Sequence, residues 1–164
     1  MSERDIKVQA IINPISGVGS KRKIPKMIEG ICSKKNCSLN ISFTEYAGHA
    51  SELTRQAIEE GAEYILAVGG DGTVNEIARA MIHSNAILGI ITKGPGNGLA
   101  RELHIPMDVK RAIDLIAKGH VTTIDCCRAN GQVFFCTCGV GFDAAVSQKF
   151  ANEKRRGSLT YIKN

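Results

Sequence analysis

The chain has 164 residues, of which 43% are hydrophobic and 23% charged, and its formal net charge is +5. This length allows one full domain and the start of another, and the composition excludes a disordered, collagen-like or coiled-coil chain. Basic residues gather near both ends of the sequence and acidic residues in its middle, but aromatic residues amount to only 5%. The interleaved basic and aromatic pattern of single-stranded nucleic-acid binders is missing, so we expect no nucleic-acid partner.

The sequence contains no pattern typical of a transmembrane segment. Its longest apolar runs, Ile65 to Val68 and Ala86 to Ile91, fall far short of the roughly 20 residues that a membrane-spanning helix requires. The charged residues 1–5 lead directly into a strand pattern, without the apolar segment of a secretion signal. The six cysteines therefore lack the secretory context that favours disulfides. We expect a cytoplasmic protein with reduced thiols.

Strand and helix patterns alternate along the first half of the chain. Apolar and β-branched runs predict strands at 6–12, 39–44, 64–68 and 87–91, and helical patterns cover 24–35, 51–60 and 74–82. Gly61 closes the second of these helices, and glycine-rich loops follow the first, third and fourth strands. This order, with its short connections, predicts an α/β fold: a three-layer sandwich built on a mostly parallel sheet.

The pattern changes after residue 98. Two helical stretches, 98–103 and 108–118, precede two β-rich runs at 121–129 and 132–138. The dipeptide Asn130-Gly131 separates these runs, and Asn-Gly between strands is the strongest short signal for a hairpin. We therefore expect a C-terminal β-hairpin in which Cys127 lies opposite Phe134 and Asp125 lies opposite Cys136.

The most informative segment is Val68 to Glu76, where an apolar strand breaks on three glycines around one acid and a helix begins. Glycine lets the backbone approach an oxyanion closely, and a helix N-terminus offers unpaired amides with a partial positive charge. A structural interpretation is also open. Thr73 and Glu76 have the spacing of a capping box, and Asp71 would favour the helix dipole.

The position of Asp71 favours chemistry over a purely structural turn. It follows the carboxyl end of a predicted parallel strand, the edge at which open α/β sheets bind ligands. A carboxylate beside polyphosphate repels it unless a metal bridges the two or the acid takes a proton from an attacking hydroxyl. Asp71 therefore indicates phosphoryl transfer.

These segments resemble the catalytic domain of the diacylglycerol kinase family, which includes bacterial lipid kinases, sphingosine kinases and ceramide kinases. The matching stretches, in the order of the family, are 13–17, Thr44, 69–76, 94–100, 103–106, Asp125 and 139–143. The motif of glycines around an acid is shared with NAD kinases and phosphofructokinases. Asn75-Glu76 directly after that motif points to the lipid-kinase branch.

The resemblance implies an ATP site with Mg²⁺ on the fold of NAD kinases and diacylglycerol kinases. Asp71 would be the catalytic acid or base. Asp125 resembles the acid of a water and magnesium network near the nucleotide, although a polar residue on the solvent face of a hairpin is the alternative interpretation. The implied nucleotide-binding residues are Asn13, Pro14, Ser16, Gly17, Thr44, Gly69, Gly70, Asp71, Gly72, Thr73, Asn75, Glu76, Gly94, Gly96 and Asn97.

Two features depart from the family pattern. Pro95 stands where many relatives have a serine or threonine, and it supplies neither a hydroxyl nor an amide donor. Relatives are also about twice as long and carry a second, β-sandwich domain that covers the lipid. We expect residues 1–164 to be the nucleotide-binding domain, ending at the start of that missing domain and inactive alone. Bare sheet edges left by truncation could pair between two chains, so a homodimer is compatible with this expectation.

The function that the resemblance implies is an ATP-dependent lipid kinase. It would transfer the γ-phosphate of Mg-ATP to the hydroxyl of a diacylglycerol-like lipid at a membrane surface, with which a cytoplasmic protein could associate peripherally. Two alternatives stay open. One is a kinase of a soluble substrate similar to the NAD kinases, and the other is a non-catalytic nucleotide-binding module that regulates a partner.

Overall fold

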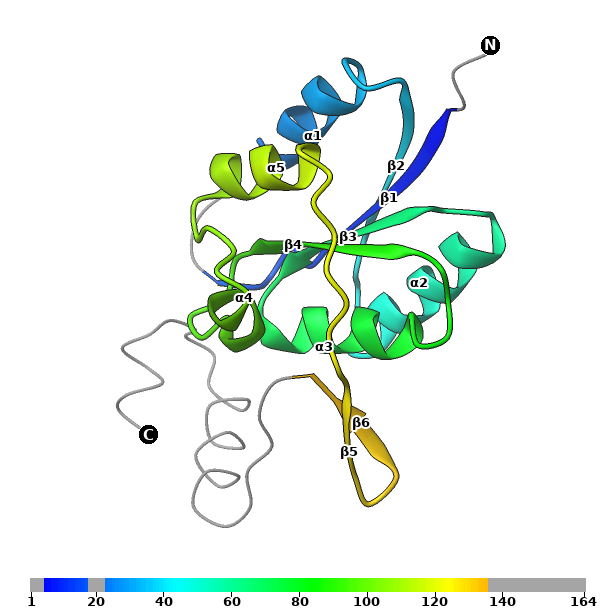
Figure 1. The fold of residues 1–164 in the computed structure, drawn as a ribbon, viewed down its shortest axis with the longest axis vertical. Coiled ribbons are helices and arrows are strands. Elements are labelled where there is room, and N and C mark those ends of the chain that lie inside the picture. Colours follow the sequence, from blue (N-terminus) through cyan, green and yellow to red (C-terminus); the bar gives the residue numbers. More distant parts are fainter. Residues whose placement is uncertain (1–4, 18–22, 136–164) are drawn as a thin grey trace.

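A four-stranded parallel sheet forms the centre of the computed structural model, which describes residues 5–17 and 23–135 (Figure 1). Its strands are β1 (Ile6–Ile12), β2 (Cys37–Phe43), β3 (Tyr64–Gly69) and β4 (Ile87–Thr92). They lie in the order β2-β1-β3-β4. The chain therefore runs from β1 to its neighbour β2 on one side, and then crosses to β3 on the other side of β1. In parallel sheets of this kind, a ligand crevice opens at the point where the strand order reverses direction.

Helices cover both faces of the sheet, which confirms the predicted three-layer α/β sandwich (Figure 1). One face carries α1 (Ile24–Cys32) and α5 (Val109–Ala117). The other carries α2 (His49–Glu59) and α3 (Asp71–Ala80), with the short α4 (Gly98–Glu102) following β4. None of the helices in the described ranges is long and apolar enough to cross a membrane.

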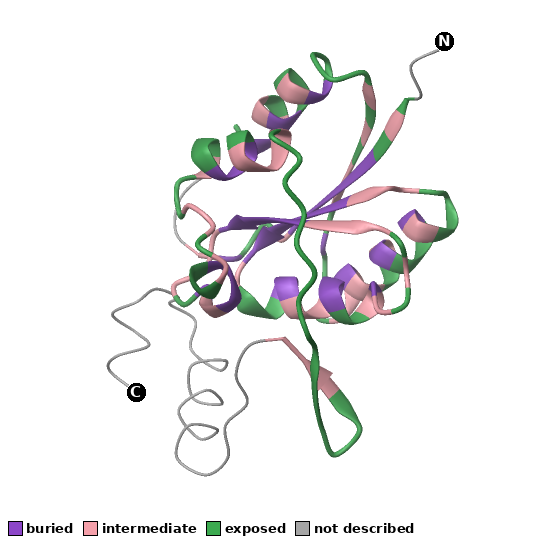
Figure 2. Ribbon diagram, viewed as in Figure 1, coloured by how far each residue is buried: buried purple, intermediate pink, exposed green. Residues whose placement is uncertain are grey.

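The buried residues form two cores, one on each face of the sheet. Figure 2 marks the buried positions along the strands and on the helices that flank them. Ile12 packs with Ile28 of α1 and Ile113 of α5, whereas Ile11 packs with Ile77 of α3. Successive side chains of a strand point to opposite faces, so these two neighbours in β1 belong to different cores. Both are fully buried.

Local signals set the ends of two helices. Asp108 caps α5, because its side chain accepts a hydrogen bond from the Arg111 N–H at 2.9 Å. Gly61 follows α2 with φ +85°, and the Ala62 N–H donates to the Ala57 carbonyl at 2.8 Å. This geometry is that of a Schellman end, and it confirms the prediction that Gly61 closes the helix.

The start of α3 differs from the prediction. The helix begins at Asp71, three residues before the predicted start at Val74. Gly70 is the N-cap residue in an extended conformation, and no side chain caps the helix. The capping-box interpretation of Thr73 and Glu76 is therefore wrong, because Thr73 already lies inside the first turn.

The hairpin is present but shorter than predicted. It consists of β5 (Cys127–Ala129) and β6 (Gln132–Phe134), and Cys127 lies opposite Phe134 as predicted. Residues 121–126 were expected to extend β5, but they are exposed and pair with no described strand (Figure 2). The predicted pairing of Asp125 with Cys136 lies outside the described residues.

Candidate active site

A cleft of about 820 Å³ opens at the carboxyl edge of the sheet, beside the ends of β1, β3 and β4. Its walls are the loops after these three strands, the first turns of α3 and α4, and the end of the hairpin. The described residues that line it are Asn13, Ser16, Gly17, Gly70, Asp71, Gly72, Thr73, Val74, Asn75, Ile90, Thr92, Gly94, Pro95, Gly96, Asn97, Gly98, Leu99, Ala100, Phe134 and Phe135. A smaller hollow of about 240 Å³, between β1, β2 and the end of α2, contains none of the predicted site residues.

Asn13 joins the first loop to the third. Its Nδ2 donates to the Thr73 Oγ1 at 3.0 Å, and its Oδ1 accepts from the Ile15 N–H at 3.1 Å. The Ser16 hydroxyl donates to the Asn13 carbonyl at 3.1 Å, and both serine and threonine are buried. These bonds fix the start of the first loop against the first turn of α3.

The third loop brings unpaired amides to the cleft. The first hydrogen bond within α3 runs from the Val74 N–H to the Gly70 carbonyl at 3.1 Å. By helix geometry the N–H groups of residues 71–73 precede this bond, and all three residues line the cleft. Such a helix start carries a partial positive charge and suits an anion.

The fourth loop is tied to the third by Asp71. The carboxylate oxygen Oδ2 accepts from the Asn97 N–H at 2.7 Å, and Oδ1 accepts from the Gly98 N–H at 2.6 Å. Asn97 is itself in the left-handed region, with φ 56°, and its side chain bonds to both backbone groups of Gly94. The acid that the sequence singles out therefore organises the neighbouring loop.

Glycine lets the backbones of the loops touch. A Cβ on Gly17 would overlap the Lys93 carbonyl oxygen, and Gly17 has φ +61°. A Cβ on Gly94 would lie 2.7 Å from the Gly70 Cα. The first, third and fourth loops thus meet main chain to main chain, which requires the absence of side chains at these positions.

The structure brings most of the predicted nucleotide-binding residues together at the cleft: Asn13, Ser16, Gly17, Gly70, Asp71, Gly72, Thr73, Asn75, Gly94, Gly96 and Asn97. The other four predicted positions, Pro14, Thr44, Gly69 and Glu76, are outside the described lining. Gly69 lies under Thr73, since an added Cβ would approach the Thr73 Oγ1 to 2.5 Å. The Glu76 carbonyl accepts the Ser51 hydroxyl at 2.9 Å and so ties α3 to α2.

Asp125 is not brought to the cleft. It is exposed in the stretch before β5 and is absent from the described lining. The described residues also contain no group of three or more His, Cys, Asp or Glu side chains placed to hold a metal ion. A role for Asp125 in a magnesium network stays a prediction.

Two aromatic residues of the cleft were not predicted from the sequence. Phe134 and Phe135 line it from the end of the hairpin. Phe135 also packs against the core formed with α2 and α3, and Arg79 of α3 donates to the Gln132 side chain at 2.7 Å. The paired phenylalanines within the strand expected at 132–138 were the available signal.

A polar cluster lies beyond Thr44, at the start of α2. The Tyr46 and His49 rings stack with centroids 4.5 Å apart, and the His49 Nδ1 accepts from the Glu45 N–H at 3.1 Å. The Tyr46 hydroxyl donates to the Glu52 carboxylate at 2.7 Å, and this hydrogen bond raises the pKa of the tyrosine. Thr44 itself is buried, and its N–H continues the sheet by donating to the Ile12 carbonyl at 2.9 Å.

The fold and the cleft define an α/β domain whose ligand site lies at the carboxyl edge of a parallel sheet. The family model for the diacylglycerol kinase catalytic domain matches residues 7–129. The chain belongs to this family.

Individual relatives agree with the family match. A diacylglycerol kinase of Staphylococcus saprophyticus is 33% identical over 131 residues, which cover 78% of this chain and 43% of that protein. A diacylglycerol kinase of Staphylococcus carnosus is 30% identical over 131 residues, with 78% and 42% covered. A crystal structure of a diacylglycerol kinase from Bacillus anthracis superimposes with a TM-score of 0.72 at 30% identity, covering 81% of this chain and 49% of that one. The chain thus spans about half or less of the length of these relatives.

Proposed function

We propose that this chain is the nucleotide-binding domain of an ATP-dependent lipid kinase. In the longer protein, the γ-phosphate of Mg-ATP would pass to the hydroxyl of a diacylglycerol-like lipid presented at a membrane surface. Family membership supports the lipid kinase class, and the cleft supports the role of this particular domain.

One observation carries the proposal: three glycine loops meet around a single carboxylate at the carboxyl edge of the sheet. Among the described residues that line the cleft, Asp71 has the one ionisable side chain. The backbone amides at the start of α3 supply hydrogen-bond donors where phosphate charge would lie, and their positions are fixed before a ligand arrives. Phosphoryl transfer depends mainly on such positioning and on electrostatic stabilisation.

The cleft fits a nucleotide that brings its own magnesium. Mg²⁺ takes oxygen ligands and usually keeps several waters, being held by substrate phosphates and one or two carboxylates. Asp71 is the carboxylate available here, with the side-chain amide oxygen of Asn75 nearby in the lining. When bound, the ion would neutralise charge on the transferred phosphate. Asp71 is the acid on which we propose that transfer depends.

The far side of the cleft favours an apolar acceptor over a soluble one. Phe134 and Phe135 line the hairpin end of the cleft and are partly exposed, so they offer apolar surface that a lipid acceptor could bury, whereas Val74 and Leu99 in the lining already belong to the core. A soluble acceptor such as NAD carries many hydrogen-bonding groups, which these side chains cannot satisfy.

Calorimetric titration of the chain with Mg-ATP and ADP tests the nucleotide site. We expect weak but saturable binding, because on this proposal the rest of the longer protein would complete the cleft. Phosphate transfer is then measured with the longer protein, comparing dioleoylglycerol in mixed micelles with NAD as acceptors. Transfer to the lipid alone supports the proposal. Transfer to NAD alone identifies a soluble-substrate kinase, and binding without transfer identifies a regulatory module.

A further inference from the structure

The contacts of Asp71 resemble a helix cap supplied from another element. Asp71 belongs to the first turn of α3, yet its carboxylate accepts the N–H groups of Asn97 and Gly98, where α4 begins. Both distances, 2.7 and 2.6 Å, are short for hydrogen bonds from backbone amides. Hydrogen bonds to an ionised acceptor are shorter and about twice as strong as neutral ones.

The loop held by this carboxylate has few alternatives for its shape. Asn97 is buried in the left-handed region, and its Oδ1 and Nδ2 bond to the N–H and carbonyl of Gly94 at 3.1 and 2.7 Å. The Gly96 carbonyl accepts the Arg101 Nε at 2.7 Å. A Cβ on Gly96 would lie 2.7 Å from the Asp71 Oδ2, so the loop closes tightly around the carboxylate.

A proton-accepting role makes a different demand on the same side chain. Both carboxylate oxygens already accept a backbone N–H, so any turn of the carboxylate toward an acceptor hydroxyl would break a bond to Asn97 or Gly98 and weaken the start of α4. We propose that Asp71 is instead a positioning residue: it holds residues 94–98 in the shape that completes the nucleotide cleft. The expected effect on nucleotide binding rests on the proposed function. The contact between Asp71 and the fourth loop does not.

Two variants disturb this contact in different ways. Asp71→Asn removes the charge and places an amide NH₂ against one of the two N–H donors, because an asparagine has only one acceptor oxygen. Gly96→Ala keeps the carboxylate but pushes a methyl group against its Oδ2. Asp108→Asn is the matched control, since Asp108 caps α5 through the Arg111 N–H in the same manner and lies outside the cleft lining.

The first measurement is amide hydrogen exchange in this chain. We expect Asp71→Asn and Gly96→Ala to accelerate exchange at Asn97 and Gly98 by about tenfold, the effect of losing one cap. The amides of β3 should keep their wild-type rates, which shows that the fold is intact. Asp108→Asn should accelerate exchange at Arg111 and not at the fourth loop. Unchanged exchange at Asn97 and Gly98 in both cleft variants would overturn the proposal.

The second measurement is nucleotide affinity. We expect Asp71→Asn and Gly96→Ala each to weaken Mg-ATP binding by about tenfold, and the double variant to bind little worse than the weaker single variant, because both act on one contact. Asp108→Asn should bind within about twofold of wild type. An Asp71→Asn protein that binds nucleotide normally but no longer transfers phosphate would show that Asp71 acts in the transfer step, as a base or as a magnesium ligand, and would refute a positioning role.

The two measurements fail independently. If the wild-type chain and the longer protein bind no nucleotide, the proposed function is lost. The exchange rates at Asn97 and Gly98 still decide whether Asp71 holds the loop. If nucleotide binds but the exchange rates do not respond to the cleft variants, the positioning role is lost and the proposed function stands.

Discussion

A side-chain hydrogen bond links the first and third loops across a wide gap in sequence. The Asn13 Nδ2 donates to the Thr73 Oγ1 at 3.0 Å, and the threonine is buried. Polar groups in such positions are costly to leave without a partner, since they lose hydration as well as the bond. This bond therefore contributes both to the stability of the domain and to the shape of the cleft.

Replacing Thr73 with valine tests this bond. Valine keeps the shape of the side chain but removes the acceptor, so we expect the free energy of unfolding to fall by about 1–2 kcal/mol. Urea unfolding followed by circular dichroism measures the change. Asn13→Ala and the double variant complete a cycle, and a coupling energy near zero would show that the two side chains do not interact in solution.

Cys32 gives the domain a pH dependence at alkaline pH. Burial, strengthened by a hydrogen bond with the Cys37 side chain, raises the pKa of the Cys32 thiol from 9.0 to about 12. The folded state therefore favours the protonated thiol. The contribution of the Cys32 thiol to stability is complete at pH values below its pKa in the unfolded chain. This contribution is lost as the pH rises toward the pKa of the thiol in the folded state.

Comparison of wild type with Cys32→Ala isolates this titration from that of other groups. We expect the stability advantage of wild type to be constant below about pH 8 and to shrink between about pH 9 and 12, by at most about 1.4 kcal/mol per pH unit. Urea unfolding in a reducing buffer at several pH values measures the difference. A difference that does not change with pH would contradict the assignment.

At the scale of elements, α1 shows where glycine serves no close contact. Gly30 is exposed within this helix, and a Cβ there would meet nothing within 4 Å. Gly69 at the end of β3 is the opposite case, because its added Cβ would meet the Thr73 side chain at 2.5 Å. Gly30 thus shows only the conformational cost of a glycine in a helix, whereas Gly69 is needed for the close approach of the Thr73 side chain to the backbone.

We expect Gly30→Ala to stabilise the domain by about 0.5–1 kcal/mol, because alanine loses less backbone freedom in a helix. Gly69→Ala should destabilise it, since backbone and side chain must shift to admit the methyl group. Thermal unfolding of the two variants gives the signs. Destabilisation by Gly30→Ala would mean that α1 is packed more closely in solution than described here.

The elements also show what local sequence can and cannot predict. The apolar runs of β3 and β4 predicted their strands well, because burial on both faces leaves a continuous pattern. The stretch 121–126 was predicted as a strand from the same kind of residues, but a strand also needs a partner to pair with. The start of α3 was missed because the N-cap residue, Gly70, carries no side-chain signal.

The candidate site divides in the same way. Glycine loops after strands are local patterns, so most of the lining could be predicted. The contact of Asp71 with the amides of Asn97 and Gly98 joins positions far apart in the sequence, and only the packing of α3 against the fourth loop creates it. The placement of Phe134 and Phe135 at the cleft likewise depends on where the hairpin packs.

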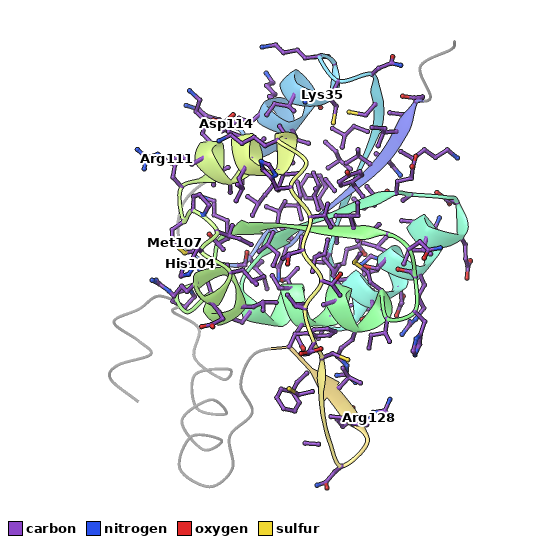
Figure 3. All side chains as sticks on the ribbon, in the orientation of Figure 1. Lys35, His104, Met107, Arg111, Asp114 and Arg128 are labelled. Atoms are coloured by element: carbon purple, nitrogen blue, oxygen red, sulfur yellow. The ribbon has the colours of Figure 1, made fainter. Side chains whose placement is uncertain are left out.

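At the scale of the whole molecule, the fold converts blocks of charge along the sequence into charged faces. The exposed basic residues of α1, α5 and their flanks are Lys23, Lys26, Lys34, Lys35, Lys110, Arg111 and Lys118. Figure 3 shows Arg111 and Asp114 on α5, and Lys35 beyond the end of α1. The opposite layer is acidic around α2, with Glu45, Glu52, Glu59 and Glu60 exposed. An anionic surface would therefore attract the α1 and α5 side of the domain.

The two cores share one sheet, so we expect them to unfold together. Ile11→Ala opens a cavity on the side of α2 and α3, and Ile12→Ala opens one on the side of α1 and α5. Each should cost about 2–5 kcal/mol, the usual range for a buried isoleucine. Circular dichroism and amide exchange during urea unfolding should each show a single transition. Separate transitions for the two layers would contradict a shared core.

The main-chain contacts of Gly17, Gly70 and Gly94 limit how the cleft can adapt to its contents. Peptide groups have no side-chain rotamers, so a bulkier ligand cannot be accommodated by the rotation of one side chain. A whole loop would have to shift, breaking several bonds at once. Phosphate analogues with bulky groups on their oxygens should therefore bind poorly against these rigid glycine loops. Changes to the part of a ligand near Phe134 and Phe135 should be tolerated better, because those side chains can rearrange.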